Sequence, residues 1–222
     1  LYWMTYYDIG WKSVVASISD LIAKAAYPKY LMLSLGIPRS HILEDLMDIM
    51  RGVRDCCKSY NCSFVGGDLN ESEKDIWVDA VAVGISKVKP PSRFNIKPGE
   101  LVLVTGLFGI TGAAYHIHYN DIPAKDEITR FIVEHTRRPK VKVEVEEVLE
   151  KIRSCIGGTI DSSDGLAASL LQLSKCSNVG FKISNLPIHP VALKYARIHN
   201  INPKDLVFYG GEEYELIITV KK

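Results

Sequence analysis

Apolar residues recur at helical spacing in two segments of the first ninety residues. Few polar residues interrupt the apolar positions within 8–27, so this segment is predicted to be a helix that is buried on much of its surface and ends at Pro28. A second amphipathic helix is predicted from Ser40, a suitable N-cap, to about Tyr60. Both helices belong to the same N-terminal part of the chain.

Short apolar runs around these helices predict strands. We expect them at 30–35, at 62–65, where the run ends at Gly66-Gly67-Asp68, and at 76–85, where valine alternates with other residues. The resulting order of helix, strand, helix, strand and strand favours a mixed α+β sheet over a doubly wound parallel sheet.

A linker is predicted at 89–99, which contains three prolines and few apolar side chains. We therefore expect two domains, an N-terminal one at 1–92 and a C-terminal one at 93–222. In the C-terminal domain the pattern predicts strands at 101–104, 181–184 and 214–220, and helices around 109–119, 126–135, 144–154, 165–177 and 189–200.

The composition is that of a globular protein with a substantial core, since 47% of the residues are hydrophobic and 24% are charged. Lys plus Arg is 27 and Asp plus Glu is 26, a balance that argues against nucleic acid or an acidic membrane surface as the main partner. The five cysteines form no C-x-x-C pair, which favours reduced thiols in a cytoplasmic protein. Residues 101–120 lack charged side chains, but their three glycines indicate strand, turn and helix rather than a membrane span.

Acidic residues stand beside small residues at several predicted strand or helix ends. These positions are Ser19-Asp20, Gly67-Asp68, Asp161-Ser162-Ser163-Asp164-Gly165 and Gly211-Glu212-Glu213. Each alone is typical of a cap or turn. Several carboxylates in one cleft would repel each other and need cations, and Mg²⁺ binds one or two carboxylates together with substrate phosphates. The joint pattern therefore indicates phosphoryl chemistry.

Two further features are candidates for contact with phosphate. The glycine-rich run 105–112 follows a predicted strand and opens a predicted helix, although it matches no P-loop and close strand–helix packing explains it equally well. Arg93 in the linker and the pair Arg137-Arg138 can each bind phosphate oxygens, but most exposed arginines are simply solvated.

Taken in chain order, several segments resemble the thiamine-monophosphate kinases of the aminoimidazole ribonucleotide synthetase-like superfamily. The motifs are S-D-L, G-G-D, V-T-G, D-x-S-D-G-L and G-G-E-x-Y-E-L, within segments 8–28, 60–72, 93–114, 136–139, 159–173, 186–190 and 210–220. The resemblance implies a two-domain α+β fold of mixed sheets with helices packed on one face. By the family pattern, the first domain lacks an N-terminal segment and the second is truncated at its C-terminus.

The resemblance implies ATP-dependent phosphorylation of thiamine monophosphate to thiamine diphosphate, a transfer to a phosphate group with ATP as co-substrate and several Mg²⁺ ions. It assigns metal ions to Asp20, Asp68, Asp161 and Asp164, and nucleotide contacts to Tyr60, Gly67, Asp68, Arg93 and Ser163. Glu213, where the family usually has Asp, is expected near the thiamine substrate. No catalytic base is assigned, because the acceptor phosphate is already ionised near neutral pH.

Two alternatives remain open. One is another ATP-using enzyme of the same superfamily, and the other is a non-catalytic nucleotide-binding paralogue, which the Glu213 change favours. The resemblance also implies a homodimer formed through the sheets of the first domain, and the small residues Val78, Ala80, Ala82 and Gly84 are the candidate interface. At 23–26, A-K-A-A replaces the family's A-x-G-A, which we interpret as mild repacking.

Overall fold

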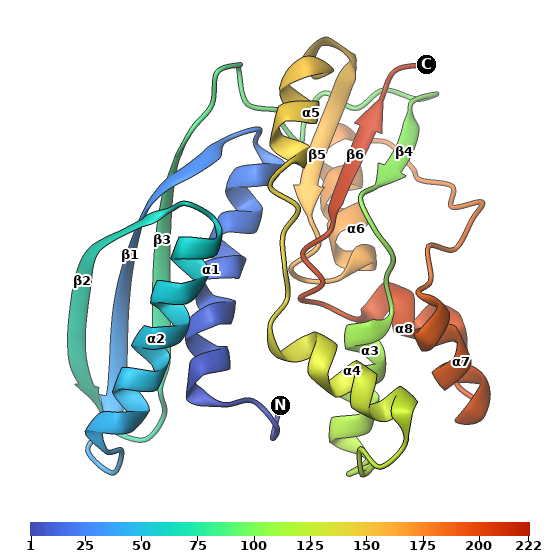
Figure 1. Ribbon diagram of the computed structural model, residues 1–222. Coiled ribbons are helices and arrows are strands. Elements are labelled where there is room, and N and C mark those ends of the chain that lie inside the picture. The colour runs from blue at the N-terminus through green and yellow to red at the C-terminus, as the bar shows by residue number, and fades with distance from the viewer.

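A three-stranded mixed sheet and two helices form the N-terminal unit (Figure 1). The computed structural model describes residues 1–222. The N-terminal elements are α1 (Tyr6–Ala23), β1 (Tyr27–Pro38), α2 (Leu43–Ser59), β2 (Ser63–Ser72) and β3 (Trp77–Ile85). The strand order is β2-β1-β3, with β1 parallel to β2 and antiparallel to β3. Leu31, Leu33 and Leu35 of β1 are buried on the face that the helices cover, as the alternating pleat requires.

The contact between α1 and α2 depends on glycine. A Cβ added at Gly10 would overlap the backbone oxygen of Ile49, and one added at Gly52 would overlap the backbone oxygen of Tyr7. The two helix axes can therefore approach closely. The start of α1 is fixed by a capping box, in which Thr5 and Asp8 each bind the other's backbone N–H.

An antiparallel three-stranded sheet with order β4-β6-β5 forms the centre of the C-terminal unit. Its strands are β4 (Leu101–Val104), β5 (Ile156–Asp161) and β6 (Leu216–Val220). The helices around it are α3 (Ile110–Tyr119), α4 (Glu127–Arg137), α5 (Val145–Lys151), the 3₁₀ turn Arg153–Cys155, α6 (Leu166–Ser177), α7 (Pro190–Ile198) and α8 (Pro203–Tyr209). The α+β class with a mixed first sheet is confirmed.

The largest apolar core cluster joins the two units. It combines buried residues of α1 and β1 with Leu149 of α5, Ile156 of β5 and Ile218 of β6. Helix α1 thus lies between the two sheets (Figure 1) and is buried on much of its surface, as its sequence predicts. No helix of the structure combines the length and the apolar composition needed to cross a bilayer.

Several predicted boundaries are wrong. Helix α1 ends at Ala23 rather than at Pro28, which lies at the start of β1, a position where a strand tolerates proline. Strand β2 continues through Gly66-Gly67-Asp68 to Ser72 because its backbone pairs with β1 along that length. The predicted strand at 181–184 has no strand partner and is irregular. Strand β5 and helix α8 were not predicted.

Two interpretations of the N-terminal unit also need correction. Ala25 has a φ of 52°, a left-handed conformation that favours glycine, so Ala in place of the family's Gly adds backbone strain rather than mild repacking. The small residues Val78, Ala80 and Ala82 face the core and pack against it. The opposite face of β3 is the exposed one, and it carries Trp77, Val81, Val83 and Ile85.

Candidate active site

Five of the predicted site residues line one cavity of about 360 Å³, here called the carboxylate cavity. Asp20 comes from the last turn of α1, and Asp161 ends β5. Ser163 and Asp164 belong to the loop that leads into α6, and Arg93 comes from the linker. The fold thereby brings together the Ser-Asp motif and the D-x-S-D-G-L motif. Ser19 of the first motif and Asp161 of the second are 142 residues apart in sequence.

Asp20 and Asp161 interact electrostatically in this cavity. Burial raises the pKa of Asp20, and the charge of Asp161 raises that pKa further, whereas Arg93 and Lys24 act in the opposite direction. Asp161 is only 3% exposed and accepts a hydrogen bond from Ser19 Oγ at 2.7 Å. Two carboxylates held this close favour binding of a cation, because Arg93 and Lys24 offset only part of their negative charge.

Arg93, which lines the cavity, carries an unsatisfied polar atom, because its Nε is buried and has no hydrogen-bond partner. The buried Oγ of Ser162, a chain neighbour of the lining residues Asp161 and Ser163, also has no partner. No three His, Cys, Asp or Glu side chains are arranged so that protein ligands alone could hold a metal ion. The pair Asp20 and Asp161 nevertheless fits Mg²⁺, because this ion commonly takes one or two carboxylates and completes its shell with water and substrate phosphate.

Three predicted nucleotide or metal contacts lie outside this cavity. Asp68 is exposed on β2 and accepts hydrogen bonds from Leu69 N at 3.0 Å and Asn70 Nδ2 at 2.8 Å. Gly67 precedes it, where a Cβ would overlap the backbone of Leu33. Tyr60 is buried after α2, its Oη accepts from Val141 N at 2.9 Å, and burial raises its pKa to about 12. The structure does not bring these residues to the carboxylate cavity.

Glu213 lines a second cavity, of about 750 Å³, here called the large polar cavity. Its Oε1 accepts from Gly109 N at 2.5 Å, at the start of α3, and its Oε2 is buried without a partner. Burial raises the pKa of Glu213 to about 8 although the backbone N–H groups of Gly109, Thr111 and Ile110 lower it. The glycine-rich turn, a candidate phosphate cradle by sequence, therefore receives the protein's own carboxyl group.

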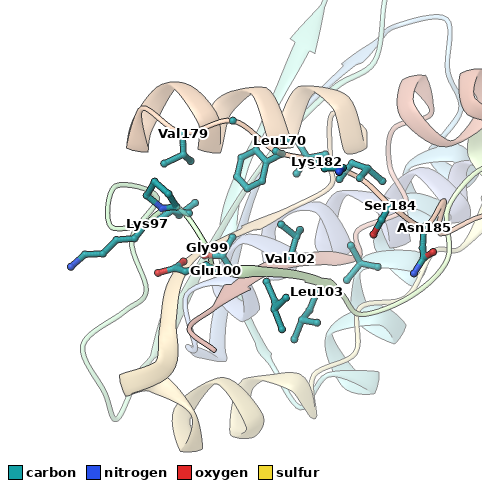
Figure 2. Close-up of a pocket in the computed structure, with 18 of the residues that line it drawn as sticks. Lys97, Gly99, Glu100, Val102, Leu103, Leu170, Val179, Lys182, Ser184 and Asn185 are labelled. Carbon is teal, nitrogen blue, oxygen red and sulfur yellow. The ribbon is translucent and has the colours of Figure 1, made fainter.

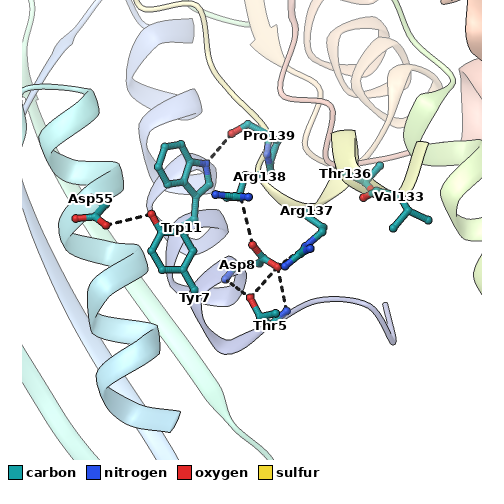
Figure 3. A network of polar contacts seen from close by, with 10 residues as sticks. All are labelled: Thr5, Tyr7, Asp8, Trp11, Asp55, Val133, Thr136, Arg137, Arg138 and Pro139. Carbon is teal, nitrogen blue, oxygen red and sulfur yellow. Dashed lines mark hydrogen bonds and ion pairs between the residues drawn. The ribbon is translucent and has the colours of Figure 1, made fainter. Parts of the chain in front are cut away.

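The arginine pair predicted as a phosphate contact is partly engaged elsewhere. Arg137 Nε donates to Asp8 Oδ2 at 2.7 Å, and Arg138 Nε lies 3.5 Å from Asp8 Oδ1 (Figure 3). Arg138 still lines the large polar cavity, whereas Arg137 does not.

Glu212, which the sequence places among the acidic candidates but to which it assigns no role, connects the two cavities. Glu212 N donates to Ser163 O at 2.7 Å, so the large polar cavity adjoins the loop of the carboxylate cavity. The Glu212 carboxylate pairs with Lys12 of α1 and accepts from Tyr115 Oη at 3.0 Å. Its φ of 60° is unusual for a residue other than glycine. The G-G-E motif was the only sequence signal for this position.

A third cavity, of about 520 Å³, is separate from these residues. It lies between β4 and the irregular segment 179–185, and Glu100, Leu103 and Lys182 are among its lining residues (Figure 2). No predicted site residue lines it.

Comparison with known proteins gives a consistent assignment. A family model described as "AIR synthase related protein, N-terminal domain" matches residues 1–86. The thiamine-monophosphate kinase of Pyrococcus abyssi is 34% identical over 219 residues, covering 99% of this chain and 67% of the relative. That of Nitrosopumilus maritimus is 31% identical over 209 residues, covering 94% and 65%.

A solved structure extends the similarity to the whole fold. The Aquifex aeolicus enzyme complexed with AMPPCP and TMP superposes with a TM-score of 0.91 at 26% identity, covering 100% of this chain and 71% of that one. The chain spans about two thirds of the length of the curated relatives that it matches. Sequence identity, coverage and fold together show that the chain belongs to the thiamine-monophosphate kinase family.

Proposed function

We propose that this protein transfers the γ-phosphoryl group of ATP to thiamine monophosphate and so forms thiamine diphosphate. The observation that carries the proposal is that two cavities, one rich in carboxylates and one larger and polar, are neighbours: Glu212, which lines the larger one, is hydrogen bonded through its backbone N–H to Ser163 O, which lines the other. A phosphoryl donor and a phosphate acceptor have to meet in line, and adjoining cavities provide for this. The relative that was solved with AMPPCP and TMP supports the same pair of substrates.

The carboxylate cavity is the proposed site of the triphosphate. Asp20 and Asp161 would hold one Mg²⁺ ion and Asp164 a further one, and these ions would supply positive charge to offset that of the phosphates during transfer. Ser163 and the guanidinium of Arg93 would contact the nucleotide, and the unpartnered Nε of Arg93 is a free donor for a phosphate oxygen. Ser19 holds Asp161 by a hydrogen bond and so fixes one carboxylate in advance.

The large polar cavity is the proposed site of thiamine monophosphate. Its size lies in the usual range for small-molecule sites. Glu213 presents a buried, unpartnered oxygen there, and Arg138 and Lys140 supply positive charge for the acceptor phosphate. We assign no general base, because an ionised phosphate oxygen is itself the nucleophile.

Asp68 and Gly67 are proposed to serve the nucleotide and its metal ions, as the family motif implies. The nucleotide contact of Tyr60 stays a prediction of that motif, because its Oη is bonded to Val141 N within the core. Asp68 is exposed on an edge strand, and its carboxylate makes only local hydrogen bonds, so it is free to engage a ligand.

A homodimer is proposed through the exposed face of the first sheet. This face carries large apolar side chains from β1 and β3: Tyr30, Met32, Trp77, Val81, Val83 and Ile85. Contiguous exposed apolar surface of this kind is typical of an interface. The five cysteines are all free thiols, which supports a cytoplasmic location.

The test is direct detection of thiamine diphosphate. The protein is incubated with ATP, Mg²⁺ and thiamine monophosphate, and the products are separated by liquid chromatography. Equal amounts of ADP and thiamine diphosphate are expected. ADP formation with formylglycinamidine ribonucleotide instead would favour another superfamily activity, and nucleotide binding without any transfer would favour a non-catalytic paralogue.

A further inference from the structure

The segment 137–139 connects the first turns of α1 to the wall of the large polar cavity (Figure 3). Arg137 and Arg138 both face the carboxylate of Asp8, and Trp11 Nε1 donates to Pro139 O at 2.9 Å. Arg138 and Pro139 also line the cavity. The position of this wall therefore depends on its contacts with α1.

Asp8 is the central group of these contacts. It is 1% exposed, and its Oδ2 accepts from Thr5 N at 3.0 Å, Thr5 Oγ1 at 2.8 Å and Arg137 Nε at 2.7 Å. Its Oδ1 makes no hydrogen bond, and its ion-pair partner is Arg138 at 3.5 Å. A buried carboxylate requires such partners, so the helix cap and the two arginines hold each other in place.

The same segment is fixed at its other end. Val141 N donates to Tyr60 Oη at 2.9 Å, and Lys142 Nζ donates to Thr105 O at 2.7 Å and to Glu215 Oε1 at 2.8 Å. Between these two anchors, Lys140 lines the cavity without a hydrogen bond or ion pair of its own. Loss of the Asp8 anchor would remove both ion pairs of segment 137–139 with α1 and leave the Trp11–Pro139 hydrogen bond as its remaining hydrogen bond to that helix.

We propose that Asp8 is a positioning residue for the phosphate acceptor: it holds segment 137–139 so that Arg138 and Lys140 face the large polar cavity. This inference rests on the proposed function, in which that cavity takes thiamine monophosphate. Asp8 acts through the arginines and does not touch the substrate. No residue of 137–139 lines the carboxylate cavity, so the effect of Asp8 is specific to the acceptor.

The test variant is Asp8→Asn, which keeps an oxygen to accept the Thr5 N–H but removes the charge that pairs with the arginines. The KM for thiamine monophosphate is expected to rise about tenfold, as for a slightly displaced binding group. The KM for ATP is expected to stay unchanged. Limited trypsin digestion gives a readout independent of activity, because cleavage after Arg137 is expected to accelerate once the segment is released.

The matched control is Asp45→Asn, which makes the same change at the corresponding helix position of α2. Asp45 accepts from Ile42 N at 3.3 Å, and neither Asp45 nor a residue bonded to it lines either cavity. It is expected to leave both KM values and the cleavage rate unchanged. If Asp8→Asn does not fold, Arg137→Gln breaks the same pair from its partly exposed side and is expected to raise the KM for thiamine monophosphate in the same way. Because this variant has no trypsin site at position 137, its readout independent of activity is faster cleavage after Lys140.

The outcomes separate the two proposals. Faster cleavage after Arg137 with an unchanged KM for thiamine monophosphate, or an equal rise in both KM values, would overturn the positioning role while leaving the proposed function intact. A wild-type protein that turns over no thiamine monophosphate would overturn the proposed function, and with it the role of Asp8 in acceptor binding.

Discussion

Replacing Glu213 with glutamine is expected to change how the stability of this protein depends on pH. The Glu213 carboxyl is buried beside the first turn of α3, and its Oε2 has no partner. Burial raises its pKa from 4.5 to about 8. A glutamine amide has nearly the same shape and can still accept the Gly109 N–H, but it does not titrate.

The magnitude follows from proton linkage. Between pH 4.5 and about 8 the folded protein retains a proton on Glu213 that the unfolded chain has released. The free energy of unfolding therefore falls as pH rises, by about 1.4 kcal/mol per pH unit from this group. Below pH 4.5 both states are protonated and the stabilisation is fully present, and it is lost as pH rises through about 8. Over the whole window the loss is at most roughly 5 kcal/mol.

The assay is urea unfolding of wild type and Glu213→Gln at four pH values between about 5 and 8, which sample the window in which only the folded state keeps the Glu213 proton. Wild type is expected to lose stability relative to the variant as pH rises, with the variant the more stable at pH of about 8. The control Glu73→Gln, at an exposed glutamate, is expected to run parallel to wild type. Parallel curves for Glu213→Gln as well would show that Glu213 is ionised in the folded protein and would refute the reasoning.

Three further substitutions test other parts of the account. Asp68→Asn should lower turnover roughly 100-fold or more. Because Asp68 is exposed, the free energy of unfolding should change by less than about 0.5 kcal/mol, and a variant that stays active in a coupled ADP assay would contradict the metal role. Ser19→Ala should lower the unfolding free energy by about 2 kcal/mol, since Asp161 loses a buried hydrogen bond, and an unchanged urea midpoint would argue against that bond. Val81→Asp, on the exposed face of β3, should give a monomer in sedimentation velocity, and a persistent dimer would place the interface elsewhere.

Elements with a clear hydrophobic period were predictable from the sequence. Helices α1 and α2 repeat apolar residues at helical spacing, and β3 alternates because only one of its faces is buried. Strand β5 has neither signal. All six of its residues are buried, so no alternation appears, and two glycines dilute its apolar character. Helix α8 begins at Pro203 and has only seven residues, too few to establish a period.

The candidate site likewise combines residues that local motifs predict with contacts that only the tertiary fold creates. Local motifs indicated Asp20, Asp161, Ser163 and Asp164, since carboxylates beside small residues at element ends mark loops that face a cleft. The contacts that organise those loops depend on the tertiary fold. Ser19 reaches Asp161 across 142 residues, and Asp8 reaches Arg137 across 129. Because of the latter contact, Arg137, a phosphate candidate by sequence, is paired with the buried carboxylate of Asp8 and does not line either proposed substrate cavity.

The central claim is that the carboxylate cavity holds the metal-bound triphosphate beside the acceptor. A crystal structure of the protein with Mg²⁺, a non-hydrolysable ATP analogue and thiamine monophosphate tests it most directly. We predict metal ions at Asp20 and Asp161, phosphate oxygens at Arg93 and Ser163, and the acceptor against Glu213. A nucleotide bound in another cavity, with no metal ion at these aspartates, would contradict the claim.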